Sequence, residues 1–112
     1  MSDSHHALTA QLEAIRRSVV DGRVLWQRHA LERMLQRGIS RSQVKQAILN
    51  GFIVESHPED RPVPSLLLAR RQPEALHVVL AYDANCGQCH VITVYRPDLI
   101  HFEVDLTTRR LS

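Results

Sequence analysis

The sequence predicts an α+β fold in which N-terminal helices pack on one face of a four-stranded antiparallel sheet. Two observations lead to this class. Before residue 51, apolar residues recur at three- and four-residue steps, the spacing of amphipathic helices. After it, short segments rich in β-branched and apolar residues are separated by turns, which is typical of strands joined by short connections.

The chain is expected to form a single domain over residues 23–112, preceded by a helical extension over residues 1–22. At 112 residues it can bury one modest core. The extension ends at Asp21-Gly22, and its apolar face consists of Leu8, Leu12, Ile15 and Val19.

Two more helices are expected before the strands. One runs from about Gln27 to Arg37 and ends at Gly38, which supplies the left-handed position that often follows a helix. The next begins with a capping box formed by Ser40 and Gln43. Residues 23–26 suit either a short strand or a first helical turn. The expected buried positions are Ala30, Leu31, Met34 and Leu35, then Val44, Ala47 and Ile48.

The strands are expected at residues 52–56, 65–70, 76–83 and 89–96, and the C-terminal tail is a candidate edge strand. If the last hairpin closes with Asp83 opposite Cys89, His77 faces Tyr95. A slip by one residue would set His77 against Arg96 instead.

Candidate functional residues begin on the second helix. His29, Arg33 and Arg37 lie four residues apart, so a helix presents them as one ridge. An imidazole beside guanidiniums suits a phosphodiester. The alternative is a solvated polar face, or pairing of the ridge with acidic residues such as Glu55, Glu59 or Asp60.

A second candidate group lies at the end of the last hairpin. His77 and Tyr95 are expected side by side, near Thr93, Arg96 and Asp98, in or after the final strand. Pro97 stops pairing and fixes the turn. The competing interpretation is a half-buried histidine whose hydrogen bonds are satisfied within the fold.

The cysteines offer three readings. Cys86 and Cys89, followed by His90, match half of a zinc site and also a haem-attachment pattern. They also fall at a predicted hairpin turn, where Asn85 and Gly87 are ordinary turn residues. The turn with free thiols is the preferred interpretation, so no metal or cofactor is expected.

Composition narrows the function classes. Arginine supplies 13 of the 14 Lys and Arg residues, yet the net charge is only +2, so any nucleic-acid site must arise from local arrangement. No apolar run could cross a membrane, and no signal-peptide pattern opens the chain, so a cytoplasmic location is expected. Five aromatic residues are too few for a base-stacking platform.

Several motifs resemble a bacterial family. RHALERMLQRGIS, the following V-x-x-A-I-x-x-G helix, D-R-P-x-P-S, L-H-V-V and I-T-V-Y-x-P-D are similar to domain-of-unknown-function family 4258, over about residues 24–109. The resemblance implies a RelE-like fold and a zinc-finger antitoxin partner of the kind that accompanies MqsR. Its motif residues correspond to His29, Arg33, Arg37, Pro64, Ser65, His77, Thr93, Tyr95, Pro97 and Asp98.

The chain departs from the family pattern in three ways. Gln27 is a poor helix cap, the cysteine pair is not part of the pattern, and the leading segment lies outside it. That segment is a candidate helix for homodimerisation.

The resulting hypothesis is a metal-independent endoribonuclease, the toxin of a type II toxin–antitoxin pair. His29 or His77 would act as acid or base, Arg33, Arg37 and Arg96 would bind phosphate, and Tyr95 would donate a hydrogen bond. The alternative is a non-catalytic module that binds RNA or a protein through the same arginines.

Overall fold

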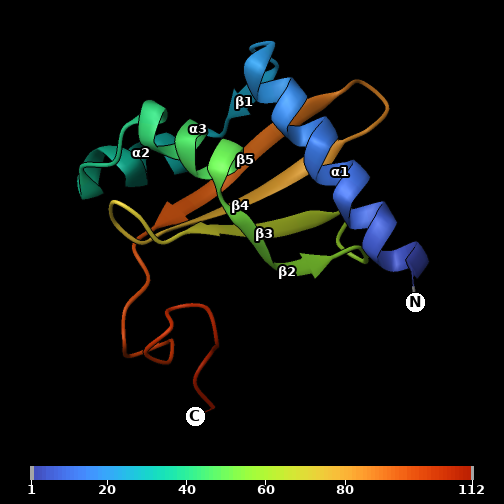
Figure 1. Cartoon of the computed structure of the whole chain (residues 1–112). Helices are drawn as coiled ribbons and strands as arrows, with labels where there is room; N and C mark the ends of the chain where they lie inside the picture. The colour runs from blue at the N-terminus through green and yellow to red at the C-terminus, as the bar shows by residue number, and fades with distance from the viewer. Residues whose placement is uncertain (1, 112) are drawn as a thin grey trace.

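The computed structural model describes residues 2–111, and for residues 2–6 only the course of the backbone. Its elements are α1 (Ser2–Val20), β1 (Val24–Trp26), α2 (Arg28–Arg37), α3 (Arg41–Asn50), β2 (Phe52–His57), β3 (Ser65–Arg70), β4 (Leu76–Asp83) and β5 (Gln88–Tyr95). The helices lie on one side of the sheet and the C-terminal tail, residues 96–111, on the other (Figure 1). No helix in the described part of the chain is long and apolar enough to span a bilayer.

The α+β class is confirmed, but the prediction of four antiparallel strands is wrong. Over residues 2–111 the sheet is mixed and has five strands, in the order β1-β5-β4-β3-β2. The additional strand, β1, runs parallel to β5 and pairs Val24 with Cys89 and Trp26 with Val91. The three residues of β1 are too few to show an alternating pattern. Its partner β5 is remote in sequence, so no turn between the two strands indicates that they pair.

The core lies between the helices and the sheet. Ile15 and Val19 of α1 are buried in it, together with apolar residues of α2, α3 and the strands. The Arg16 guanidinium donates to the carbonyl oxygens of Ile48 (3.0 Å) and Gly51 (2.7 Å), which ties α1 to the end of α3. The N-terminal helix is therefore packed into the core at its C-terminal end. The expected burial of Leu35 is wrong, because 85% of this residue is exposed.

Local signals fixed the ends of α2 and α3 as expected. Gly38 adopts the left-handed conformation, with φ 66°, after α2. Ser40 and Gln43 form the complete capping box of α3. Gly51 follows α3 where the chain has no room for a side chain, because a Cβ there would lie 2.3 Å from the carbonyl oxygens of both Ala47 and Ala69.

The register of the hairpin of β4 and β5 changes along its length. At its open end His77 pairs with Tyr95 and Val79 with Thr93, as the first of the two registers predicts. The ladder then shifts between Val79 and Leu80, and Asp83 pairs with Gln88 rather than Cys89. A β-bulge accommodates the extra residue on β5, so both ends of the hairpin keep their apolar side chains in the core.

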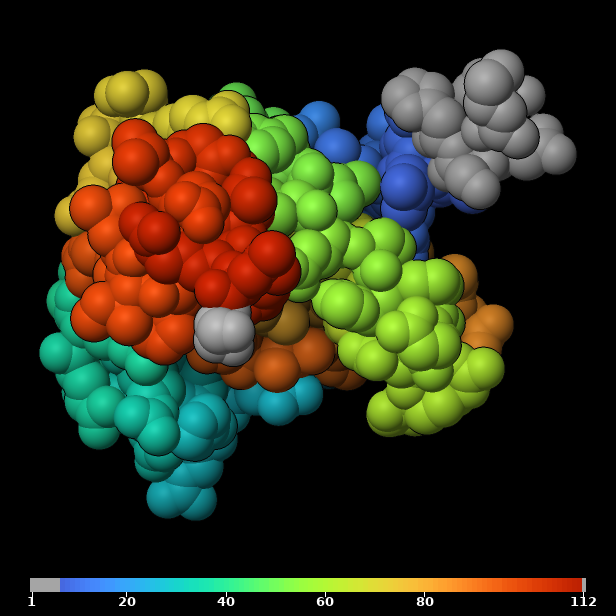
Figure 2. Space-filling view, turned by 90° about the horizontal axis from the view of Figure 1, so that it is seen from below, coloured from blue at the N-terminus to red at the C-terminus, as the bar shows by residue number. Residues whose placement is uncertain are grey.

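The tail covers part of the sheet face opposite the helices, here called the open face, which carries His77, Val79, Ala81 and Tyr95. Figure 2 shows the tail, orange to red, over one end of this face, with the β2–β3 loop, yellow-green, to one side. Instead of an edge strand, the tail forms a compact loop with one isolated bridge, between Phe102 and Arg109. Phe102 is its anchor, with 2% of the residue exposed.

Candidate functional site

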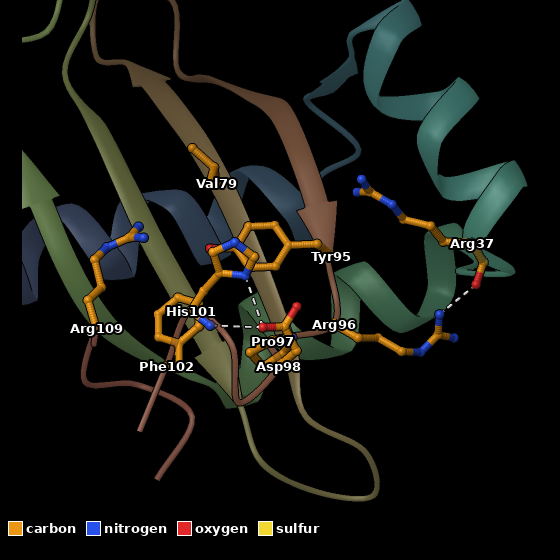
Figure 3. A pocket seen from close by; sticks show the side chains of 9 residues that line it. All are labelled: Arg37, Val79, Tyr95, Arg96, Pro97, Asp98, His101, Phe102 and Arg109. Atoms are coloured by element: carbon orange, nitrogen blue, oxygen red, sulfur yellow. Dashed lines mark hydrogen bonds and ion pairs between the residues drawn. The ribbon is translucent and has the colours of Figure 1, made fainter. Parts of the chain in front are cut away.

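A cavity of about 640 Å³ lies where the tail meets the open face, and we call it the tail-side hollow. Its walls come from the end of α2, from β4 and β5, and from the tail (Figure 3). The lining residues are Arg37, Val79, Tyr95, Arg96, Pro97, Asp98, His101, Phe102 and Arg109. Three guanidiniums, an imidazole and a phenol therefore border one space.

His77 contacts Tyr95 and Phe102, which line this hollow, and fixes the orientation of Tyr95. Its Nε2 lies 2.8 Å from the carbonyl oxygen of Leu106, which can only accept, so Nε2 carries the proton. Nδ1 is then an acceptor, 3.2 Å from the Tyr95 hydroxyl, which donates to it. Burial lowers the pKa of His77, which favours this neutral form. His77 is 1% exposed, so it cannot meet a substrate directly.

Tyr95 consequently presents a lone pair, rather than a hydrogen, to the hollow. Burial raises the pKa of its phenol, which keeps the hydroxyl protonated. The ring stacks with Phe102 at a centroid distance of 6.5 Å. Phe102 in turn meets the edge of His77 at 4.8 Å, so aromatic contacts and a hydrogen bond hold the tail against β4 and β5.

Arg109 closes one side of the hollow. Its Nε and Nη2 donate to the Glu55 carboxylate at 2.5 and 3.2 Å, and its guanidinium lies over the Phe102 ring. The pKa of Glu55 is lowered, chiefly by this hydrogen bond, and that of Arg109 is raised by the same contact. Glu55 also binds His57 at 3.2 Å and raises its pKa. An ion pair thus fixes the cation that the tail brings to the sheet.

Arg37 and Arg96 belong to the opposite side. Arg37 Nη1 donates to the Val94 carbonyl at 2.6 Å, and Figure 3 shows the guanidinium reaching from α2 toward β5. Arg96 instead extends toward the end of α2, where it donates to the Arg37 carbonyl at 2.5 Å and pairs with Glu74 at 3.0 Å. Arg37 therefore has unused donors on the cavity side, whereas Arg96 mainly caps a helix.

His101 and Asp98 form a pair at the mouth of the hollow. The carboxylate Oδ1 lies 2.9 Å from His101 Nδ1 and also accepts the backbone N–H groups of Ile100 and His101 (Figure 3). These bonds lower the pKa of Asp98. A charged carboxylate at Nδ1 favours a proton there and leaves Nε2 as the free nitrogen. This arrangement is suited to proton transfer.

The structure brings together some of the residues predicted from the sequence and leaves others apart. His77 and Tyr95 are in contact, and Arg37 and Arg96 line the same hollow as Tyr95. Thr93 pairs with Val79 in the ladder but does not line the hollow. His29 and Arg33 are exposed on α2 and contact each other, with Arg33 Nε donating to His29 Nε2 at 3.3 Å. Neither lines the hollow.

Sequence reasoning missed His101 and Arg109. A partial signal existed for His101, since it follows Asp98 by three residues in a turn fixed by Pro97, a spacing that allows the carboxylate to bind the backbone and the ring. Arg109 had no local signal, because its partner Glu55 is 54 residues away.

The two cysteines do not share a site. Cys86 is exposed in the turn, whereas Cys89 is buried in the core beneath the helices. Burial raises the pKa of Cys89 to about 12, so it remains a thiol. Among the residues that the structure describes, no three or more His, Cys, Asp or Glu side chains are grouped to hold a metal ion.

Comparison with known proteins gives a family and no closer relative. No curated protein and no solved structure matches the chain. The sequence model of the family described as "Domain of unknown function (DUF4258)" matches residues 26–96, which include all of the sheet except the first two residues of β1, together with α2 and α3. This match covers more than half of the chain, which therefore belongs to the DUF4258 family.

Proposed function

We propose that the chain is a metal-independent endoribonuclease with its active site in the tail-side hollow, and that it is the toxin of a type II toxin–antitoxin pair with a RelE-like fold. The observation that carries the proposal is the placement of Arg37 and Arg109 on opposite sides of a cavity that also contains Tyr95 and His101. This set combines cations for a phosphate with a group that can move a proton.

Arginine suits the phosphoryl group for a geometric reason. Its planar guanidinium can donate two parallel hydrogen bonds to a phosphate while other N–H groups remain bound to the protein. Arg37 and Arg109 are both held by the fold, through Val94 and Glu55. Cations fixed in advance stabilise the charge that develops on the phosphoryl oxygens without reorganising during the reaction.

The reaction requires that the attacking oxygen lose a proton and that the leaving oxygen gain one. In the proposed step, Nε2 of His101 takes the proton of a ribose 2′-hydroxyl, whose oxygen attacks the adjacent phosphorus. The bond to the 5′-oxygen breaks, and that oxygen takes a proton from solvent. The products are a 2′,3′-cyclic phosphate and a 5′-hydroxyl. The Tyr95 oxygen accepts a hydrogen bond from the 2′-hydroxyl of a neighbouring nucleotide and so orients the RNA.

The roles first assigned to the histidines, to the arginines and to Tyr95 change accordingly. Tyr95 was expected to donate a hydrogen bond to the substrate, but its hydroxyl donates to His77, and in the proposal its oxygen accepts. His77 becomes a positioning residue, because both of its nitrogens are occupied and its hydrogen bond orients Tyr95. His29 and Arg33 would contact RNA outside the hollow, through exposed groups on α2. Arg96 supports the site by holding the end of α2, which carries Arg37.

The test is cleavage of a labelled RNA by purified protein and by matched variants. His101→Ala is expected to lower the rate about 10²–10⁴-fold, and Arg37→Ala to lower it strongly as well. Arg28→Ala is the matched control for Arg37, since Arg28 belongs to the same helix and its side chain is 94% exposed. Full activity of His101→Ala together with loss of activity in His29→Ala would place the reaction outside the hollow and refute the proposed site.

A non-catalytic RNA-binding module is the second candidate, and one observation favours it. The His101 side chain is 69% exposed, so the fold does not exclude water from the imidazole. For such a module, wild-type protein would bind RNA in a salt-sensitive manner that depends on Arg37 and Arg109, without cleavage. Cleavage products in the wild-type reaction would eliminate this candidate.

The toxin assignment also proposes partners and a location. The proposed partner is a small zinc-finger antitoxin, the proposed substrate is RNA, with messenger RNA as one candidate, and the proposed site of action is the cytoplasm. Homodimerisation through α1 belongs to the same proposal; Val20, 72% exposed at its end, offers an apolar contact. Co-expression with the product of the adjacent reading frame tests the pairing, since rescue of growth is expected only from a cognate antitoxin.

A further inference from the structure

A second cavity, of about 460 Å³, lies on the open face beside the β2–β3 loop, and we call it the loop-side hollow. Its floor includes Ala81, whereas the tail-side hollow includes Val79 of the same strand. Residues two apart on a strand point to the same face and lie about 7 Å from each other. The two hollows are therefore neighbours on one surface. The lining residues are Gln27, Asp60, Arg61, Pro62, Val63, Ser65, Ala81, Asp83, His90 and Ile92.

The loop-side hollow differs chemically from its neighbour. Its floor and one wall are apolar, and two carboxylates, Asp60 and Asp83, border it. Asp60 Oδ2 accepts the Ser65 hydroxyl and Asp83 Oδ1 accepts the Asn85 backbone N–H, so each carboxylate is oriented through one oxygen. Each carboxylate oxygen has two lone pairs, so both oxygens of a carboxylate can still accept from a ligand. Negative charge here disfavours a phosphate. A flat, partly apolar group that carries N–H donors fits instead.

We propose that the loop-side hollow binds the guanine base of a nucleotide whose phosphate occupies the tail-side hollow. This inference rests on the proposed function, because RNA supplies both groups. Unpaired RNA bases are recognised through their Watson–Crick edges. On that edge guanine alone presents two adjacent donors, N1–H and the N2 amino group, which match the two oxygens of a carboxylate. Adenine, cytosine and uracil each place an acceptor lone pair next to the donor.

Other groups in the loop-side hollow support a base. The His90 and Gln27 side chains have no hydrogen-bond partner among the described residues, so both are available to a ligand. The Arg61 guanidinium is held by the carbonyls of its own loop through Nη1, which leaves other donors for the guanine O6. An imidazole can also stack on a base.

The test is an NMR titration with separate probes for the two hollows. Guanosine, which has no phosphate, is expected to shift the resonances of His90 and Ala81. Adenosine, cytidine and uridine should shift them at much higher concentration. Inorganic phosphate should shift Tyr95 and the side-chain signals of Arg37 and Arg109 instead.

Each outcome bears on one proposal separately. Phosphate shifts without guanosine shifts would overturn the base site and leave the proposed function standing. Guanosine shifts without phosphate shifts would support the base site and count against the proposed active site. Equal responses to all the nucleosides would overturn the preference for guanine.

Variants locate the binding group. Asp60→Asn and Asp83→Asn replace a carboxylate oxygen by an amide that donates, and each keeps an oxygen for Ser65 or Asn85. At least one should weaken guanosine binding on the order of tenfold, with unchanged shifts on adding phosphate. Asp21→Asn, an exposed carboxylate outside both hollows, is the matched control. Wild-type guanosine affinity in both hollow variants, with folding verified by circular dichroism, would overturn the assignment.

Discussion

Tyr95→Phe is the substitution that most directly tests the hydrogen bond between His77 and Tyr95. It removes one oxygen and keeps the ring that stacks with Phe102. The lost partner leaves His77 Nδ1 without a donor, and His77 is 1% exposed, so water cannot replace the hydroxyl. The expected result is destabilisation rather than a change of fold.

The magnitude follows from which group is left unpaired. A buried polar atom that loses its partner costs about 1–3 kcal/mol, more than the net value of an ordinary hydrogen bond. In a His77→Leu background the orphaned nitrogen does not exist, and Tyr95→Phe should then cost less than about 0.5 kcal/mol. The double-mutant cycle is thus expected to give a coupling energy on the order of 1–2 kcal/mol.

Urea unfolding, followed by the fluorescence of the single tryptophan, Trp26, measures these free energies. Circular dichroism provides a second probe of the same transition. The reasoning fails if Tyr95→Phe costs as much in the His77→Leu background as in wild type, since the hydroxyl would then act through another contact. It also fails if neither background is destabilised.

Three further predictions concern the anchoring of the tail, its ion pair with the sheet, and the pH dependence of stability. Phe102→Ala removes the buried anchor of the tail, a change that costs about 3–5 kcal/mol in a rigid core. The tail should therefore detach, and its backbone amides should exchange faster in hydrogen-exchange experiments. Unchanged protection of these amides would refute the anchoring role. Glu55→Gln weakens a partly exposed ion pair with Arg109, so the free energy of unfolding should fall by less than about 1 kcal/mol in urea titration. A larger fall would mean that the pair belongs to a buried network. The pKa of His77 is lowered by burial, so the unfolded chain binds its proton more readily; stability from this group is complete above pH about 6.5 and falls as the pH drops below it. Urea titrations from pH 7 to 5 should show a weaker slope in His77→Leu, and an equal slope in both proteins would contradict this assignment.

The sequence predicted best those features whose determinants are local. The capping box of α3 requires only Ser40 and Gln43, three residues apart, and Gly38 needs only its own conformation. The facing of His77 and Tyr95 followed from alternation along two strands joined by a short turn. The β-bulge opposite Val79 and Leu80 had no such signal, because the sequence of each strand taken alone shows no interruption.

The helical ridge shows how a correct local prediction can still misplace a site. His29, Arg33 and Arg37 do share a helix. Of these three residues, only Arg37 is hydrogen-bonded to the sheet, at the carbonyl of Val94, whereas His29 and Arg33 are exposed although the same helix buries Ala30 and Met34 in the core. A spacing of four residues places side chains on one face of a helix, but it does not tell which of them a distant strand will contact.

The tail explains why half of the candidate site could not be predicted from the sequence. The sequence of residues 101–112 suits an edge strand, but Phe102 packs between His77, Tyr95 and Arg109, and the segment forms a compact loop. That fit depends on three side chains brought together only after β4, β5 and β2 have paired. The same docking carries His101 and Arg109 to the hollow, so the proposed chemistry depends on an aromatic contact rather than on a sequence motif. If this is so, loosening Phe102 should disable the hollow while the sheet and helices remain folded.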